Sequence, residues 1–281
     1  MAEDKTKRIR ELIGTLRAAG RAYYQESREI MSNFEYDKLY DELVSLEKET
    51  GIVFANSPTQ NVGYEVVSAL PKERHEKPML SLNKTKSVEE LADWLGGQTG
   101  LLSWKMDGLT IVLTYQNGTL VKAVTRGNGE IGEVITANAK AFANVPLNIS
   151  YQGELILRGE AIIRYSDFEK INEQIEDVDA KYKNPRNLCS GSVRQLNNEI
   201  TAKRNVYFYA FALVQAEGVE FDNSREKQFL WLKSQGFDVV EYKKVIGAQV
   251  PETVQWFSEA ITHNDFPSDG LVATYDDIAY G

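Results

Sequence analysis

The sequence predicts an α+β protein in which a small helical hairpin domain precedes a larger domain of antiparallel sheets with flanking helices. Three observations predict this fold class. In the first 50 residues, apolar side chains recur at helical spacing. Beyond residue 63, short runs rich in β-branched and aromatic residues dominate. These runs are joined by hairpin signals rather than by regular helical crossovers, which disfavours a doubly wound parallel sheet.

The first segment is predicted to be helical because of its apolar spacing. The residues concerned are Ile9, Leu12, Ile13, Leu16 and Tyr23. A second helix is expected to start at Ser32, since Ser32 and Glu35 have capping-box spacing. Its apolar face is Tyr36, Leu39, Tyr40, Leu43 and Leu46. With residues 26–31 as the connection, the hairpin has about 50 residues, too few to be very stable alone.

Residues 50–63 are rich in Gly, Asn, Ser, Pro and Thr, which indicates a loop or domain junction. We therefore place the domains at residues 1–65 and 66–281. Asn117-Gly118 is a strong hairpin signal between two expected strands, residues 109–115 and 120–125. Two further strands are expected at residues 155–163 and 206–214, and helices near 166–175 and 224–235.

Composition limits the possible functions. The formal net charge is −9, which argues against a protein that coats nucleic acid through a global positive field. The basic residues between Lys181 and Arg204 form either a local phosphate-binding strip or a solvated surface. A single cysteine, Cys189, excludes an intrachain disulfide and a cysteine-held zinc. There is no long apolar run and no apolar export signal, so we expect a cytoplasmic protein without a membrane span.

Lys105 is the candidate nucleophile. It lies in Trp104-Lys-Met-Asp-Gly108, between a short apolar stretch and the first expected strand. A lysine in a partly apolar site can lose its proton more readily and attack an electrophile. By itself the segment is also compatible with a surface lysine in a turn.

Four further motifs follow Lys105 in the chain. A Gly-rich loop at residues 125–132 contains Arg126 and is suited to the approach of backbone amides to a phosphate. Arg158-Gly-Glu160 lies inside an expected strand, where a carboxylate could bind a ribose hydroxyl or a metal. Residues 184–196 carry two arginines in a turn-rich stretch, and Ser268-Asp-Gly-Leu-Val272 is near the end.

In this order, the motifs resemble the adenylation domain of bacterial NAD⁺-dependent DNA ligases, a nucleotidyltransferase (ATP-grasp-like ligase) fold. They are K-x-D-G, T-R-G-x-G-x-x-G, R-G-E, N-P-R-N-x-x-x-G-S-x-R-Q-L and D-G-L-V. His75–Leu82, Ser57–Gln60, Tyr23-Tyr24 and Tyr36-Asp37 also match, so the resemblance runs from about residue 8 to the last residue.

The resemblance implies an NAD⁺-dependent DNA ligase module that uses Mg²⁺ in replication or repair. Lys105 would attack NAD⁺, release nicotinamide mononucleotide (NMN) and hold AMP for transfer to the 5′-phosphate of nicked DNA. Asp107, Arg126 and Glu160 would assist. Ser81, Leu82, Ser103, Phe211 and Thr274 would line the nucleotide site, and Phe211 could instead be a core residue. The other implied contacts are Arg186 and Arg194 to DNA phosphates, and Tyr23, Tyr24, Asn33, Tyr36 and Asp37 to the nicotinamide half. These last aromatics could instead pack the helices.

Three positions depart from the family pattern. Ser103 stands where a glutamate is usual, Asn33 where an aspartate is usual, and Thr274 where a lysine contacts the α-phosphate. Lys243 or Lys244 could supply the missing cation. A final lysine motif, an OB-fold, a zinc module and a helix-hairpin-helix clamp are not in these 281 residues. The sequence is therefore a piece of a longer protein or a short divergent relative.

Two other functions stay open on the sequence alone. An ATP-using ligase or capping-type nucleotidyltransferase shares K-x-D-G, but it has no nicotinamide half for the N-terminal tyrosines to bind. A degenerate relative could hold NAD⁺ or nicked DNA with weak or no catalysis. The expected partners are NAD⁺ and nicked duplex DNA, and we expect a monomer.

Overall fold

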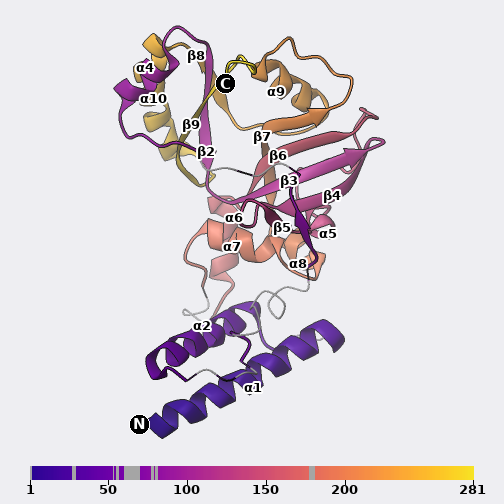
Figure 1. Ribbon diagram of the computed structural model, residues 1–281, viewed down its shortest axis with the longest axis vertical. Helices are drawn as coiled ribbons and strands as arrows, with labels where there is room; N and C mark the ends of the chain where they lie inside the picture. Colours follow the sequence, from indigo (N-terminus) through magenta and orange to yellow (C-terminus); the bar gives the residue numbers. More distant parts are fainter. Residues whose placement is uncertain are drawn as a thin grey trace. The chain divides into compact units, whose positions relative to one another are not determined.

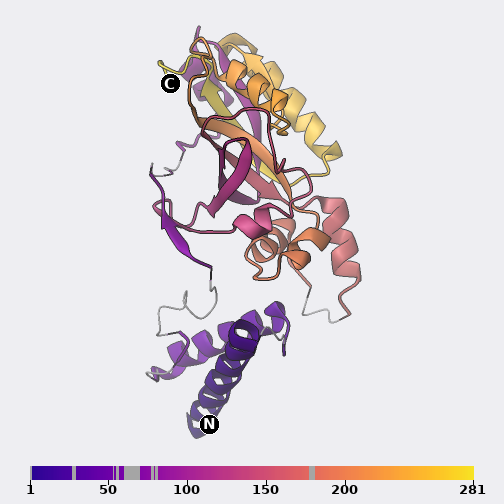
Figure 2. The same cartoon turned by 90° about the vertical axis from the view of Figure 1, so that its right-hand side faces the viewer.

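The computed structural model describes residues 2–26, 30–52, 54, 57–59, 70–76, 79, 82–176 and 181–281. The chain forms two compact units (Figures 1 and 2). One unit is Met1–Ala69 with Ile175–Lys181, and the other is Leu70–Gln174 with Tyr182–Gly281. The domain boundary that we expect between residues 65 and 66 lies outside the described residues.

The first unit is a helical hairpin of α1 (Ala2–Glu26) and α2 (Asn33–Thr50). The predicted capping box begins α2, because Ser32 Oγ accepts from the Glu35 amide at 3.2 Å and Glu35 Oε2 accepts from the Ser32 amide at 2.8 Å. Gly51 ends the helix in the left-handed region, with φ 67°. Both helices and the start of the second are therefore confirmed.

An apolar core holds the hairpin together. Its buried members are Ile9, Leu12, Ile13, Leu16 and Leu43. Each such side chain contributes about 1.5–3 kcal/mol when it is fully removed from water. At the edge of this core, Thr59 donates a hydrogen bond to the buried Glu47 carboxylate, which fixes the segment after α2 against that helix.

The described strands of the second unit form three antiparallel sheets. The four-stranded sheet has the order β4 (Thr119–Thr125), β3 (Leu109–Gln116), β6 (Leu155–Ile162), β7 (Tyr207–Ala216). The three-stranded sheet has the order β8 (Tyr242–Val245), β2 (Gly100–Met106), β9 (Ser268–Tyr275). The third pairs β1 (Lys72–Arg74) with β5 (Ile131–Glu133). The predicted fold class is confirmed.

Helices flank both larger sheets (Figure 1). They are α4 (Val88–Leu95), α5 (Thr136–Ala139), α6 (Tyr165–Glu173), α7 (Pro185–Val193), α8 (Asn198–Lys203), α9 (Arg225–Ser234) and α10 (Val250–Ala260). Two 3₁₀ turns, η2 (Gly247–Gln249) and η3 (Ile261–His263), flank α10. Helix α10 packs on the three-stranded sheet, where Phe257 meets Trp104 edge to face at 4.6 Å.

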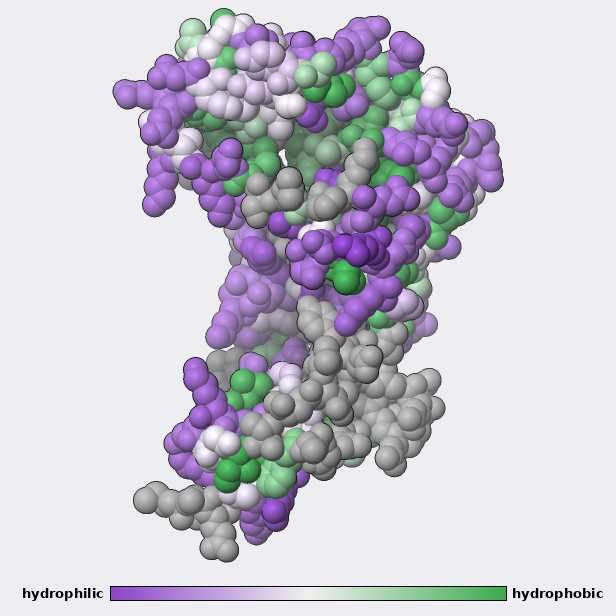
Figure 3. All heavy atoms as spheres, viewed as in Figure 1, coloured by the Kyte–Doolittle hydropathy of each residue, from purple (hydrophilic) through white to green (hydrophobic). Residues whose placement is uncertain are grey.

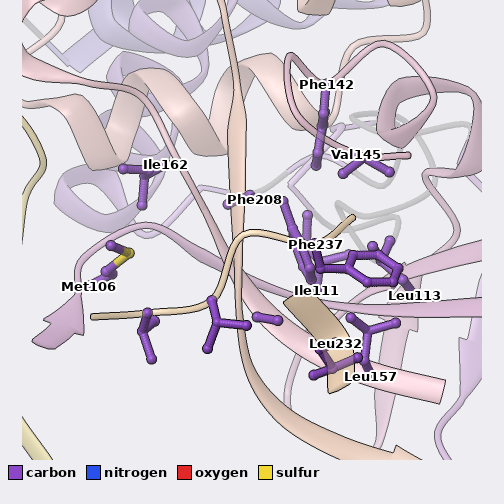
Figure 4. Close-up of a cluster of buried hydrophobic side chains, with 14 of the residues drawn as sticks. Met106, Ile111, Leu113, Phe142, Val145, Leu157, Ile162, Phe208, Leu232 and Phe237 are labelled. Atoms are coloured by element: carbon purple, nitrogen blue, oxygen red, sulfur yellow. The ribbon is translucent and has the colours of Figure 1, made fainter. Parts of the chain in front are cut away.

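The core of the second unit is one apolar cluster that includes residues from both larger sheets. Figure 4 shows Leu157 and Phe208 from the four-stranded sheet gathered with Leu232 of α9 and with Phe237. The face of the molecule in Figure 3 is mainly hydrophilic, with small hydrophobic areas. Within the described part of the chain, no helix combines the length and apolar character needed to cross a bilayer.

The predicted β-hairpin and the two later strands are confirmed. Asn117 and Gly118 both have positive φ, 50° and 74°, as a type I′ turn requires. The sequence does not predict β1, β2, β5, β8 or β9, and it leaves the apolar stretch before Lys105 without an assigned structure. That stretch is β2, the central strand of the three-stranded sheet.

Candidate active site

The K-x-D-G segment lies where the chain passes from one sheet to another. Lys105 is in β2 of the three-stranded sheet, and Leu109 begins β3 of the four-stranded sheet. Gly108 makes the crossing possible, since a Cβ there would lie 1.9 Å from the Ala161 carbonyl oxygen of β6. Lys105 therefore belongs to a strand and not to a surface turn.

Asp269 of β9 holds the Lys105 side chain. Both carboxylate oxygens accept from Lys105 Nζ, at 2.6 and 2.7 Å. Gly270 pairs with Lys105 and Ser268 with Met106, so Asp269 is the extra residue of a β-bulge. Bulges re-aim side chains, and this one brings a carboxylate to the lysine. The sequence reading singled out the segment around Asp269 but gave that residue no role.

Glu160 lies in β6 of the four-stranded sheet, beside β3. Its Oε1 accepts from the Gly108 amide at 3.1 Å, and its Oε2 accepts from Thr110 Oγ1 at 2.8 Å. Burial raises the pKa of the Glu160 carboxyl to about 7, and these two hydrogen bonds oppose the shift. The structure thus ties Glu160 directly to the K-x-D-G segment.

Arg186 contributes a cation to the same group. It lies in the first turn of α7, whose N-cap is Asn184. Its Nη1 donates to Asp107 Oδ1 at 2.8 Å. Contacts at a single strand crossing therefore connect residues from four motifs, namely Lys105, Asp107, Glu160, Arg186 and Asp269.

The other arginines of the basic strip are engaged within the protein. Arg194 pairs through Nε with Oε2 of the buried Glu133 at 2.7 Å. Arg204 lies over the ring of Tyr182 at 5.6 Å. The arginines of this stretch therefore bind carboxylate or aromatic partners, while Lys183 and Lys203 are exposed.

The Gly-rich loop does not present its amides as expected. The amides of residues 128–131 all donate within the loop: Gly129 to the Arg126 carbonyl at 3.0 Å, Asn128 to that of Ile131 at 3.3 Å, and the other two to Asn128 Oδ1. Our expectation that these amides approach a phosphate is therefore wrong. Gly127 serves the tight turn, with φ 57° and no room for a Cβ. The Arg126 guanidinium donates to the Met79 carbonyl at 3.2 Å.

Phe211 projects from β7 at another bulge. Arg158 pairs with Ala212 and Gly159 with Ala210, so Phe211 is the additional residue. Its side chain is 36% exposed, which excludes the alternative of a core phenylalanine. An exposed aromatic ring on the active-site sheet is available for stacking.

Ser103 and Thr274 share a face of the three-stranded sheet with Lys105. Ser103 is two residues before Lys105 in β2, so both side chains lie on one face. Thr274 is on the same face because it pairs with Leu101, two residues before Ser103. Ser103 is buried and donates a long 3.4 Å hydrogen bond to the Val272 carbonyl. Both residues bring neutral hydroxyl groups to this face.

The two lysines suggested as substitute cations have other partners. Lys243 lies over the Trp256 ring at 3.9 Å. In the β2–β8 register Lys243 pairs with Leu102, so its side chain is on the face opposite Lys105. Lys244 shares the Lys105 face but pairs with Glu226 at 2.5 Å and Asp276 at 3.5 Å.

In the helical unit, Tyr36 is the best-defined candidate residue. It lies in the first turn of α2, and burial raises the pKa of its hydroxyl to about 12. That hydroxyl is buried and has no hydrogen-bond partner within the described ranges. Asp37 is exposed beside it. A buried hydroxyl without a partner is costly, and a ligand could satisfy it.

Several predicted site residues are not placed at the level of side chains. Tyr23, Tyr24 and Asn33 lie in helices whose side chains at these positions are not described, and Ser81 is outside the described residues. Leu82 is described and is 59% exposed. Among the described residues no three His, Cys, Asp or Glu side chains form a metal-binding group. We therefore assign Mg²⁺ to no protein ligands.

Comparison with known families bears on this site. The family model for the "NAD-dependent DNA ligase adenylation domain" matches residues 67–281. The model for the "DNA ligase-like, N-terminal NAD+-binding domain" matches residues 2–63. The chain belongs to the NAD-dependent DNA ligase adenylation-domain family, and the resemblance drawn from its motifs is confirmed.

Curated relatives agree. The chain is 68% identical over 278 residues to the DNA ligase of Ruminiclostridium cellulolyticum, covering 99% of this chain and 42% of the relative. It is 67% identical over 279 residues to the DNA ligase of Lachnoclostridium phytofermentans, covering 99% and 43%. The chain thus spans less than half the length of these relatives. A solved archaeal ATP-dependent RNA ligase aligns with 72% of this chain and 46% of its own at TM-score 0.44 and 16% identity, a weak likeness.

Proposed function

We propose that this chain is the module of an NAD⁺-dependent DNA ligase that takes AMP from NAD⁺, with Lys105 as the residue that carries it. The observation that carries the proposal is the Lys105–Asp269 contact at the strand crossing, beside Glu160 and Asp107. A lysine amine that has lost its proton can attack a phosphate, and the Asp269 contact holds this amine in one position.

In the proposed reaction, Lys105 Nζ attacks the α-phosphorus of NAD⁺. A P–N bond forms, the P–O bond of the pyrophosphate breaks, and NMN leaves. The ammonium must first lose a proton, and Asp269 is in place to accept it. Glu160 accepts a hydrogen bond from a ribose hydroxyl, and Phe211 stacks on adenine. The nucleotide is lined by Ser103, Thr274, Ser81 and Leu82. Mg²⁺ bound with NAD⁺ would supply positive charge at the phosphates.

The second half of the proposal concerns the partners. Tyr23, Tyr24, Asn33, Tyr36 and Asp37 of the helical unit bind the nicotinamide half. AMP then passes from Lys105 to the 5′-phosphate of nicked DNA, whose backbone Arg126, Arg186 and Arg194 contact. For Arg186 and Arg194 this requires phosphate to replace the carboxylates that they now bind, an exchange that guanidinium groups permit. We further propose that the protein acts as a monomer in the cytoplasm, in replication or repair.

Intact mass spectrometry tests the proposal. After incubation with NAD⁺ and Mg²⁺, the protein should gain the mass of one AMP, and ATP in place of NAD⁺ should give none. Lys105→Ala should abolish the adduct while circular dichroism stays unchanged. Lys140→Ala, at an exposed lysine outside the site, is the control. An adduct on Lys105→Ala, or peptide mapping of AMP to another lysine, would refute the assignment.

A further inference from the structure

Arg186 contacts the site of the first reaction step before any DNA is bound. Its Nη1 donates to Asp107 Oδ1 at 2.8 Å, while 58% of its side chain is exposed. The proposed function assigns Arg186 only to a DNA phosphate. Its partner in the structure, however, belongs to the K-x-D-G segment that carries Lys105.

Both members of this ion pair are held by their own elements. Helix α7 carries Arg186 in its first turn and lies against β6, where the Cys189 thiol donates to the Ala161 carbonyl oxygen at 3.2 Å. The Asp107 amide donates to the Pro267 carbonyl oxygen at 2.9 Å, which holds the backbone at the strand crossing. The two side chains therefore start from fixed positions, and their contact requires no loop to become ordered.

The strand crossing is rich in carboxyl groups. Lys105 already contacts the Asp269 carboxylate, and Asp107 and Glu160 bring two more carboxyl groups to the crossing. The negatively charged pyrophosphate of NAD⁺ has to enter here, and like charges at short range repel. Arg186 reduces that repulsion by pairing with Asp107. The first turn of α7 adds to this effect, because the N-terminus of a helix carries partial positive charge.

Glu160 lies within electrostatic reach of the same ion pair. Burial is the main cause of its raised pKa, and the hydrogen bonds from Thr110 and Gly108 oppose that shift. Beyond these causes, Arg186 lowers the pKa of the Glu160 carboxyl and Asp107 raises it. The charges of the pair therefore act on the carboxyl group that the proposed function places at the ribose of NAD⁺.

We propose that Arg186 is a positioning residue for adenylation itself: it holds and neutralises Asp107, so that the NAD⁺ pyrophosphate can approach Lys105 before any DNA is bound. The inference rests on the proposed function and deepens it, since a residue assigned to the nick also serves the earlier step. A DNA phosphate takes the guanidinium from Asp107 only after AMP is on Lys105. The same arginine thus serves the two steps in succession.

Single-turnover adenylation of the 281-residue chain without DNA tests this role. The AMP adduct is followed by mass over a range of NAD⁺ concentrations in the presence of Mg²⁺. Arg186→Gln should raise the NAD⁺ concentration for half-maximal rate at least about tenfold, the effect of losing one charge-assisted hydrogen bond, with a smaller change in the maximal rate. Arg186→Lys keeps the charge and should recover most of the loss.

The matched control is Lys227→Gln. Lys227 is another exposed cation in the first turn of a helix, α9, and it also pairs with a carboxylate, that of Asp222. It lies outside the groups assigned to the reaction, so its replacement should leave the dependence on NAD⁺ unchanged. Circular dichroism reports the folding of each variant.

Carbon-13 NMR of the glutamate carboxyl groups gives a second readout that needs no NAD⁺. Glu160→Gln identifies the signal of Glu160, whose pKa burial raises to about 7. Arg186→Gln should move the titration midpoint of this signal to higher pH, because a cation that favours the carboxylate is lost. Asp107→Asn should move it to lower pH, because an anion that disfavours the carboxylate is lost. Lys227→Gln should leave it in place.

Two results would overturn the proposal. One is an Arg186→Gln variant that forms the adduct without DNA at an unchanged dependence on NAD⁺ concentration. The other is a Glu160 midpoint that moves in neither the Arg186 nor the Asp107 variant. An unmodified chain that forms no adduct would refute the proposed function and this role with it, so the two kinds of failure are distinguishable.

Discussion

At the scale of single residues, the Lys105–Asp269 pair has two consequences that oppose each other. The bidentate contact holds the amine in one place, which lowers the entropic cost of attack. The same carboxylate faces an ammonium, which is not a nucleophile until it loses a proton. Asp269 therefore assists the attack only if it also accepts the proton that the Lys105 ammonium loses.

The variant Asp269→Asn separates these roles, because it keeps the shape of the side chain and removes its basicity. We expect single-turnover adenylation to slow by about 10²–10⁴, the usual range for a general base. The rate is measured from AMP-adduct mass against time, with Asp222→Asn at an exposed site as control. A rate within twofold of the unmodified protein would remove Asp269 from the proton transfer.

Glu160 makes the stability of the protein depend on pH. Its folded-state pKa is raised from 4.5 to about 7, so the folded state binds more protons than the unfolded state between these values. Stability therefore falls as pH rises through this window. Glu160→Gln mimics the protonated form, and the Thr110 hydroxyl can rotate to accept from the new amide.

We expect Glu160→Gln to raise the midpoint of thermal unfolding at pH 8 and to leave it unchanged at pH 4. The gain corresponds to about 1–3 kcal/mol at one pKa unit per 1.36 kcal/mol, with allowance for partial solvation. Calorimetry at both pH values measures it. An equal shift at both pH values would show that the effect is unrelated to ionisation.

Thr274 lies on the Lys105 face, and the resemblance drawn from the motifs leads us to expect a lysine at this position. Lys243 is on the other face and Lys244 is held by two carboxylates, so neither replaces it in the described arrangement. A preorganised donor at a phosphate is worth roughly 3–4 kcal/mol.

We therefore expect Thr274→Lys to raise single-turnover adenylation at least about tenfold, which is about 1.4 kcal/mol. Thr274→Met, similar in length and without charge, is the control for bulk. An unchanged or lower rate with lysine would mean that the site already compensates by another group.

At the scale of elements, the sequence predicts features that depend on adjacent residues. It does not predict the pairing of strands that are far apart in the chain. The β3–β4 hairpin is marked by Asn117-Gly118, because that turn depends on two adjacent residues. Strand β2 has no such mark, since its partners β8 and β9 follow more than 130 residues later. The bulges that expose Phe211 and Asp269 depend on the register between strands, so no local pattern in the sequence predicts them.

The helical hairpin carries its own prediction. If Tyr36 and its neighbours bind the nicotinamide half, deletion of residues 1–65 should abolish AMP-adduct formation from NAD⁺. The remaining sheets keep their separate core, so circular dichroism should show a folded protein, and Tyr36→Phe serves as a milder variant. Adduct formation by the truncated protein at an unchanged rate would make the hairpin purely structural.

At the scale of the whole molecule, charge limits binding to duplex DNA. The net charge is −9, and Arg186, Arg194 and Arg204 are already engaged. Since phosphate contacts supply much of the affinity for DNA, the negative net charge and these three engaged arginines favour weak binding to a duplex.

We accordingly expect this chain alone to seal nicked duplex poorly over multiple turnovers, even when it is fully adenylated. Denaturing gels of a labelled nicked substrate measure sealing, and the AMP adduct measured in the same samples is the control. Efficient sealing at physiological salt would contradict the prediction.

The strand crossing at Gly108 also restricts how this gene can vary. Any single-base change in a glycine codon that alters the amino acid without ending translation adds a Cβ atom, and here that atom would meet the Ala161 carbonyl oxygen at 1.9 Å. A smaller replacement does not exist, so conservative and radical substitutions share the same steric conflict. Position 108 can therefore change only together with a shift of β6, the strand that carries Glu160. Substitutions at position 108 are therefore prevented by this steric conflict, whatever their effect on catalysis.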